Sequence, residues 1–166
     1  MSVLFGAGGA GAPLVANLVY YFRVKAVGWS GISSAFTSSL SEITRPAVPI
    51  PASPVFPSVE LSSVSFSWTA NGNDAGTDYE AHVSTDDFAT VNFTSTTKNL
   101  SVLFGTSGAG ATLVSNTTHY FRVRTSGWTG LLSAYAGVQS TATLAQIPGA
   151  GSPVFITVQL EVLTRK

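Results

Sequence analysis

The sequence predicts an all-β fold, an antiparallel sandwich of about seven short strands. Apolar residues alternate with polar ones at period 2 in short runs, and turn residues separate these runs about every 8–12 positions. Ser, Thr, Gly, Val and Ala dominate the composition, which suits strands and tight turns better than helices. Hydrophobic residues make up 45% of the chain, enough to fill one sandwich core.

The chain also repeats itself at a fixed offset of 99 residues. Residues 2–6 (Ser-Val-Leu-Phe-Gly) return as residues 101–105, and Tyr-Phe-Arg-Val at 21–24 returns at 120–123. About 30 of 66 aligned pairs are identical. Because this period is the size of one small all-β domain, and far longer than a solenoid repeat, each period is expected to form one sandwich.

The repeat divides the chain into one complete unit, residues 46–146, between two partial units, residues 1–45 and 147–166. The first partial unit keeps the equivalents of the last three strands, and the second keeps the equivalents of the first two. We therefore expect a window cut from a longer tandem array. Only the complete unit is expected to fold alone.

The complete unit opens with a proline-rich stretch, residues 46–57. Proline lacks the N–H that a central strand needs, so this stretch is interpreted as a stiff linker that runs into an edge strand. Alternating runs then predict strands at residues 59–61, 64–68, 79–83, 91–93 and 102–104. A last strand pair is predicted at 119–124 and 131–135, joined by a turn that contains Trp128.

The charge of the chain excludes several classes of partner. Eight Lys and Arg balance eight Asp and Glu, whereas nucleic acid and anionic membranes select basic surfaces. No apolar run reaches the roughly 18–20 residues of a membrane span, so we expect no membrane insertion. Cysteine is absent, which excludes disulfides and thiolate zinc sites.

Motifs for catalysis, cofactors or metals are weak. Residues 6–11 match G-x-G-x-x-G, but a dinucleotide site needs a helix at the motif, and Pro13 follows instead. The acidic residues between 74 and 87 are interpreted as turn formers, with an adventitious cation as the alternative. His82 and His119 fall on opposite sheet faces by strand parity. We predict no catalytic residue, no cofactor and no metal site, and hence no enzyme.

Several residues of the complete unit resemble the fibronectin type III family. They are Trp68, Tyr79 and the run from Leu113 through Asn116-Thr-Thr-His119-Tyr-Phe-Arg-Val-Arg124. The resemblance implies a seven-stranded immunoglobulin-like sandwich, closest to the Ser/Thr-rich tandem versions on bacterial secreted and surface proteins. It also implies that Glu80 faces Arg122 or Arg124 across two strands, in a pair worth well under about 1 kcal/mol. The family's corner tyrosine corresponds to Tyr20 in the first copy and to His119 in the second.

The resemblance implies a non-catalytic spacer or adhesion module of an extracellular or cell-surface protein. The best candidates for ligand binding are Trp29 and Trp128, each in a Gly-Trp-Ser/Thr-Gly turn, where an exposed indole can stack on a sugar ring or anchor a protein. The alternative is that each ring packs on its own hairpin or on a neighbouring domain. A further alternative is an accessory domain of a larger extracellular hydrolase.

The expected partners are protein or polysaccharide ligands and neighbouring repeats of the same array. A sharper hypothesis is head-to-tail self-association by strand donation. In this hypothesis residues 152–166 of one molecule complete the first partial unit of the next, through an open edge.

Overall fold

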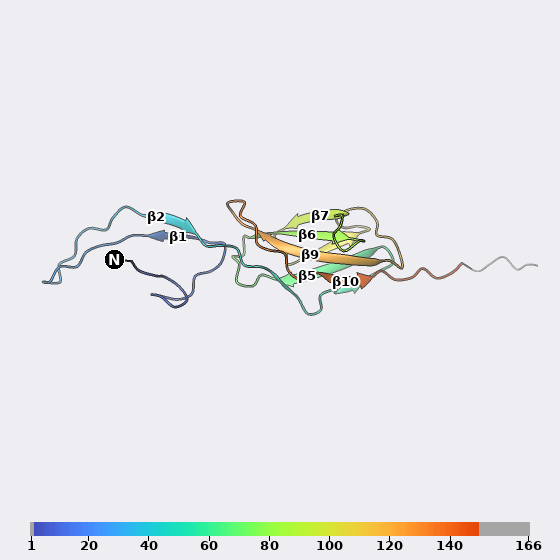
Figure 1. Ribbon diagram of the computed structural model, residues 1–166, viewed down its shortest axis with the longest axis horizontal. Coiled ribbons are helices and arrows are strands. Elements are labelled where there is room, and N and C mark those ends of the chain that lie inside the picture. Colours follow the sequence, from blue (N-terminus) through green and yellow to red (C-terminus); the bar gives the residue numbers. More distant parts are fainter. Residues whose placement is uncertain (1, 150–166) are drawn as a thin grey trace, which may run out of the picture.

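A computed structural model describes residues 2–149, and these residues form strands without a helix. Figure 1 shows the first partial unit and the complete unit lying end to end along the long axis. The first unit contains β1 (Val19–Phe22) and β2 (Leu40–Ile43). The complete unit contains β3 (Ile50–Pro51), β4 (Ser58–Val59), β5 (Ser63–Thr69), β6 (Asp78–Ser84), β7 (Phe93–Thr97), β8 (Ser101–Gly105), β9 (Thr118–Ser126) and β10 (Gln139–Ala142). The third unit predicted at 147–166, and the donor segment 152–166, lie outside the described residues except for 147–149.

The strands of the complete unit form two antiparallel sheets. One sheet has the order β10-β9-β6-β7, and in the other β5 pairs with β3, β4 and β8. If β3 and β4 are counted as two halves of one interrupted first strand, the unit has seven strands. The order is that of an immunoglobulin-like sandwich, which confirms the predicted fold class.

The core lies between the two sheets and is rich in aromatic rings. Phe66 of β5, Phe104 of β8 and Phe121 of β9 are fully buried. The ring centroid of Phe121 lies 5.5 Å from that of Phe66 and 6.0 Å from that of Phe104. Burial alternates along β9, as the period-2 pattern of its apolar residues predicts.

The proline-rich stretch does more than link the two units. Its short strand β3, and β4 directly after it, pair with β5 at the sheet edge, where proline is tolerated. Val48, Val55 and Phe56 pack against the core from this stretch. The stretch is therefore an irregular edge strand that also contributes apolar surface to the sandwich.

The position predicted for the last strand is wrong. Residues 131–135 form no regular strand, and the final strand is β10, further along the chain. The hydroxyl of Ser133 accepts a hydrogen bond from the N–H of Thr125 at 2.9 Å, in the place of a backbone carbonyl. A side-chain acceptor of this kind competes with the backbone hydrogen bonds between the strands. Regular pairing with β9 begins only where Gln139 faces Phe121.

The first partial unit keeps the local turns of the complete unit but not its first strand. The N–H of Gly9 donates to the carbonyl of Gly6 at 2.9 Å, and Gly108 donates to Gly105 at the same distance. Residues 2–6 copy β8, yet they form no strand. β8 pairs with β5, and the described part of the first unit holds no equivalent of β5. Turns are thus encoded locally, whereas the strand requires its partner.

Candidate functional site at the joint between the units

The two candidate tryptophans lie in identical turns. After β9, the N–H of Gly127 donates to the carbonyl of Leu131 at 2.8 Å, and Gly130 donates back to Gly127 at 2.9 Å. In the first unit, Gly28 bonds Ile32 and Gly31 bonds Gly28 at the same two distances. Trp29 and Trp128 therefore occupy equivalent positions.

Their surroundings differ. Trp29 is fully exposed, whereas Trp128 is 61% exposed. The indole of Trp128 lies so close to Gly76 that a Cβ there would approach ring atom Cζ2 to 2.8 Å. The ammonium of Lys98 lies 5.6 Å from the ring centroid and donates a hydrogen bond to the carbonyl of Gly76 at 2.8 Å. The ring therefore rests on the loop before β6, and its other surface remains exposed.

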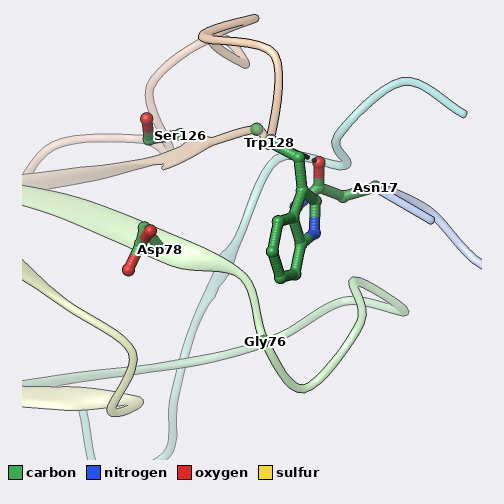
Figure 2. Close-up of a pocket in the computed structure, with 6 residues that line it drawn as sticks. Asn17, Gly76, Asp78, Ser126 and Trp128 are labelled. Atoms are coloured by element: carbon green, nitrogen blue, oxygen red, sulfur yellow. Dashed lines mark hydrogen bonds between the residues drawn. The ribbon is translucent and has the colours of Figure 1, made fainter. Parts of the chain in front are cut away.

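The side chain of Asn17 connects the two units. Its amide Nδ2 donates to the hydroxyl of Thr77 at 2.9 Å, and its Oδ1 accepts from the N–H of Trp128 at 3.2 Å. Figure 2 shows Asn17 projecting from the first unit toward the Trp128 backbone. Asn17 is 1% exposed although it belongs to a surface turn, because the complete unit covers it. The joint thus buries a polar group whose donor and acceptor are both satisfied.

Backbone hydrogen bonds fix the same turn in a second way. The N–H of Ala16 donates to the carbonyl of Gly72, and the N–H of Asp74 donates back to Ala16, both at 3.1 Å. The side chain of Asn73 bonds both the N–H and the carbonyl of Ala47, at 2.8 and 2.9 Å, and so holds the segment that links the units. The joint is therefore polar and directional.

Two clefts flank the indole of Trp128. One, of about 130 Å³, is lined by Asn17, Gly76, Asp78, Ser126, Gly127 and Trp128 (Figure 2). The other, of about 290 Å³, lies between Trp128 and residues of β1 and β2. Both are smaller than the pockets of about 300–1,000 Å³ that enclose drug-sized ligands. The geometry favours shallow contact over an enclosed binding site.

A second polar cluster covers the outer face of β6 and β9. Glu80 faces Arg124 in register, and His82 faces Arg122. The imidazole Nε2 lies 2.6 Å from a carboxylate oxygen of Glu80, while Nδ1 faces the guanidinium of Arg122 at 3.4 Å and the hydroxyl of Tyr135 at 3.3 Å. A neutral ring with its proton on Nε2 satisfies all these contacts, because Nδ1 is then an acceptor.

Burial, hydrogen bonds and charges in this cluster shift two pKa values. Burial opposes ionisation of Glu80, but hydrogen bonds from Arg124 and His82 outweigh it and hold the pKa of the carboxyl below its usual value. Burial lowers the pKa of His82, and the positive charges of Arg122 and Arg124 lower it further against the opposing effect of Glu80. The cluster is a compact electrostatic network on the sheet surface.

The other residues singled out in the sequence have structural positions. Asp74 accepts from the N–H of Gly76 at 3.1 Å, and Asp86 accepts from Thr90, so both stabilise turns. The described residues contain no group of three or more His, Asp or Glu placed to hold a metal ion. Nor does any helix within 2–149 have the length and apolarity to cross a membrane. His119 is buried and its Nε2 lies 3.3 Å from the carbonyl of Val114, while the hydroxyl of Tyr20 accepts from the N–H of Val15.

Comparisons with known proteins add little beyond this geometry. No family model and no curated protein matches the sequence. Among solved structures, a myokine structure covers 60% of this chain and 98% of its own at 14% identity (TM-score 0.48), and a multi-domain crystal structure of titin covers 64% at 20% identity (TM-score 0.45). The chain spans 36% of that titin structure. Domains d3–d4 of the rat CD45 extracellular region cover 86% of this chain and 75% of their own at 11% identity (TM-score 0.49). The strand order of the complete unit itself defines the fold.

Proposed function

We propose that this chain is a non-catalytic segment of a fibronectin type III-like tandem array on an exported or cell-surface protein, where it acts as a stiff spacer. The observation that supports this proposal is the Asn17 joint, the set of side-chain and backbone hydrogen bonds that connects the first unit to the complete unit. Directional hydrogen bonds restrict rotation as well as separation, so successive units keep a defined orientation.

Spin labels test the stiffness of this joint, and the absence of native cysteine makes their attachment selective. One label replaces Ser38 in the first unit and the other Thr94 on β7, both exposed. We expect a single narrow distance distribution. Asn17→Gly keeps the left-handed backbone of the turn (φ 56°) but removes the amide, and should broaden the distribution.

The matched control is Asn116→Gly. Asn116 occupies the equivalent turn with φ 51°, but it is exposed. This variant should leave the distribution between positions 38 and 94 unchanged. A broad distribution in the unsubstituted chain would contradict the spacer function.

A second candidate function is binding of a polysaccharide or protein through the tryptophan turns. The observation that favours it is the full exposure of Trp29 and the open outer surface of Trp128. Glycan and protein arrays probed with the unsubstituted chain, Trp29→Ala and Trp128→Ala test it. Binding that is lost in either variant supports this function, and no binding by the unsubstituted chain rejects it for the probes on the array.

A further inference from the structure

The turn that docks at the joint recurs in the complete unit. Asn116 copies Asn17, and both adopt the left-handed backbone conformation. The N–H of Asn116 donates to the carbonyl of Leu144 at 3.0 Å, just as that of Asn17 donates to Arg45 at 3.3 Å. The hydroxyls of Thr143 and Thr44 each close their turn by donating to a carbonyl at 2.6 Å. The two turns therefore present their asparagines in the same way.

Only one of the two asparagines is engaged. The amide of Asn17 is buried against Thr77 and Trp128 of the next unit. The amide of Asn116 is exposed and makes no hydrogen bond within residues 2–149. Ser115 stands where Ala16 stands in the first turn, but Ala16 contributes only its backbone to the joint, so this difference removes no contact.

The receiving side of the joint recurs as well. At Gly127, a Cβ would lie 2.8 Å from the carbonyl oxygen of Leu131 in the same loop and 2.9 Å from the Oδ1 of Asn17, so this glycine leaves room both for its own turn and for the asparagine of the other unit. Gly28 is the copy of Gly127, and its nearest neighbour lies in its own loop, the carbonyl of Ile32 at 3.3 Å. The loop of the first unit therefore leaves a similar space beside Gly28, and no asparagine among the described residues occupies it.

We propose that the Asn116 turn is a docking site for the following unit of the array, and that the joint formed by Asn17 is repeated there. The partner is a further copy of the same 99-residue unit. It is recognised by a backbone N–H equivalent to that of Trp128 and a hydroxyl equivalent to that of Thr77. This interface is heterologous, with a different surface on each side, so it propagates from unit to unit. The inference rests on the proposed spacer function and extends its joint to the next repeat.

The test inserts one period into the full chain, as a second copy of residues 46–144 placed after Leu144. The new Thr77 then lies 60 residues after Asn116, the separation that Asn17 has from its own Thr77. Spin labels at Gly137, the copy of position 38 with open space around its Cα, and at Thr94 of the inserted copy report on the new joint. Labels at positions 38 and 94 of the original copy report on the first.

We expect both label pairs to give one narrow distribution with the same mean distance. Asn116→Gly should abolish the narrow peak of the new pair only, and Asn17→Gly that of the original pair only. Asn99→Ala, at an exposed asparagine outside the joint, should change neither. This inference is overturned if the new pair gives a broad distance distribution, or one that Asn116→Gly does not change, while the distribution of the original pair stays narrow. That result leaves the spacer function intact. A broad original pair overturns both.

Discussion

Glu80 and Arg124 face each other across β6 and β9, and the guanidinium donates three hydrogen bonds to the carboxylate. Nη2 of Arg124 donates to both carboxylate oxygens at 2.9 and 3.0 Å, and Nε donates to one of them at 3.2 Å. The side chain of Arg124 is 23% exposed and that of Glu80 is 19% exposed. The centroid of the Tyr135 ring lies 4.6 Å from the guanidinium carbon of Arg124. The pair that sequence alone valued as a weak surface contact is thus partly buried in a network.

This geometry predicts a coupling free energy of about 1–2 kcal/mol between Glu80 and Arg124, above that of an exposed pair. A double-mutant cycle with Glu80→Gln and Arg124→Gln, read by equilibrium unfolding in urea, measures it. Lys98 and Asp78, whose side chains are 58% and 45% exposed, form the comparison pair and should couple by less than about 0.5 kcal/mol. Equal coupling in the two cycles would contradict the prediction.

His82 predicts a pH dependence of stability. Its folded pKa lies below the unfolded value of 6.5, so the unfolded chain binds more protons there. The contribution of His82 is complete above pH 6.5 and is lost as the pH falls through the folded pKa. Glu80, whose pKa is lowered from 4.5, acts in the same direction but at lower pH.

The melting temperature should therefore fall between about pH 7 and about pH 5. His82→Gln removes the titrating group and should flatten the curve in this window, which thermal unfolding followed by circular dichroism measures. A steady slope in the His82→Gln variant would assign the effect to other groups.

The repeat contains the same phenylalanine once in the core and once in a partly exposed position, which allows a matched test of core packing. Phe121 is fully buried between the sheets, and its copy Phe22 is partly exposed. Phe121→Ala should cost about 3–5 kcal/mol of the free energy of unfolding of the complete unit. Phe22→Ala should leave that unit within about 0.5 kcal/mol, because it lies in the other unit. Urea unfolding followed by fluorescence of the buried Trp68 separates the two outcomes, and a comparable loss in both variants would show that the units unfold together.

The different exposures of the three tryptophans predict how strongly acrylamide quenches the fluorescence of each. Trp68 is 2% exposed, Trp128 is 61% exposed, and Trp29 is fully exposed. Acrylamide quenching, averaged over the tryptophans present, should therefore fall in Trp29→Phe, change least in Trp128→Phe and rise in Trp68→Phe. Stronger loss in Trp128→Phe than in Trp29→Phe would show that the joint leaves the Trp128 ring more open than the structure has it.

The core of the sandwich could be predicted from the sequence, because inward residues of β5, β6 and β9 alternate with polar ones. Strand β10 could not, since Gln139, Ser140, Thr141 and Ala142 show no alternation of apolar and polar residues, although they pair in register with β9. The turns could be predicted from Gly, Asn and Asp, which tolerate positive φ.

The joint was missed for a different reason. A single asparagine in a turn is normally solvated, and only the facing unit buries Asn17. One signal was present: the asparagine is identical in both copies, while its neighbours Ala16 and Leu18 are replaced by Ser115 and Thr117. Whether Trp29 and Trp128 bind a ligand stays a prediction.

The two halves of the joint lie at opposite ends of the folded unit: Asn116, the copy of Asn17, comes just before β9, and Trp128 just after it. Each period therefore carries one half of the contact at each end. An in-frame gene duplication of a whole period supplies both halves at once, wherever within the period the break falls. An array built on this plan can lengthen in a single recombination event without evolving a new interface.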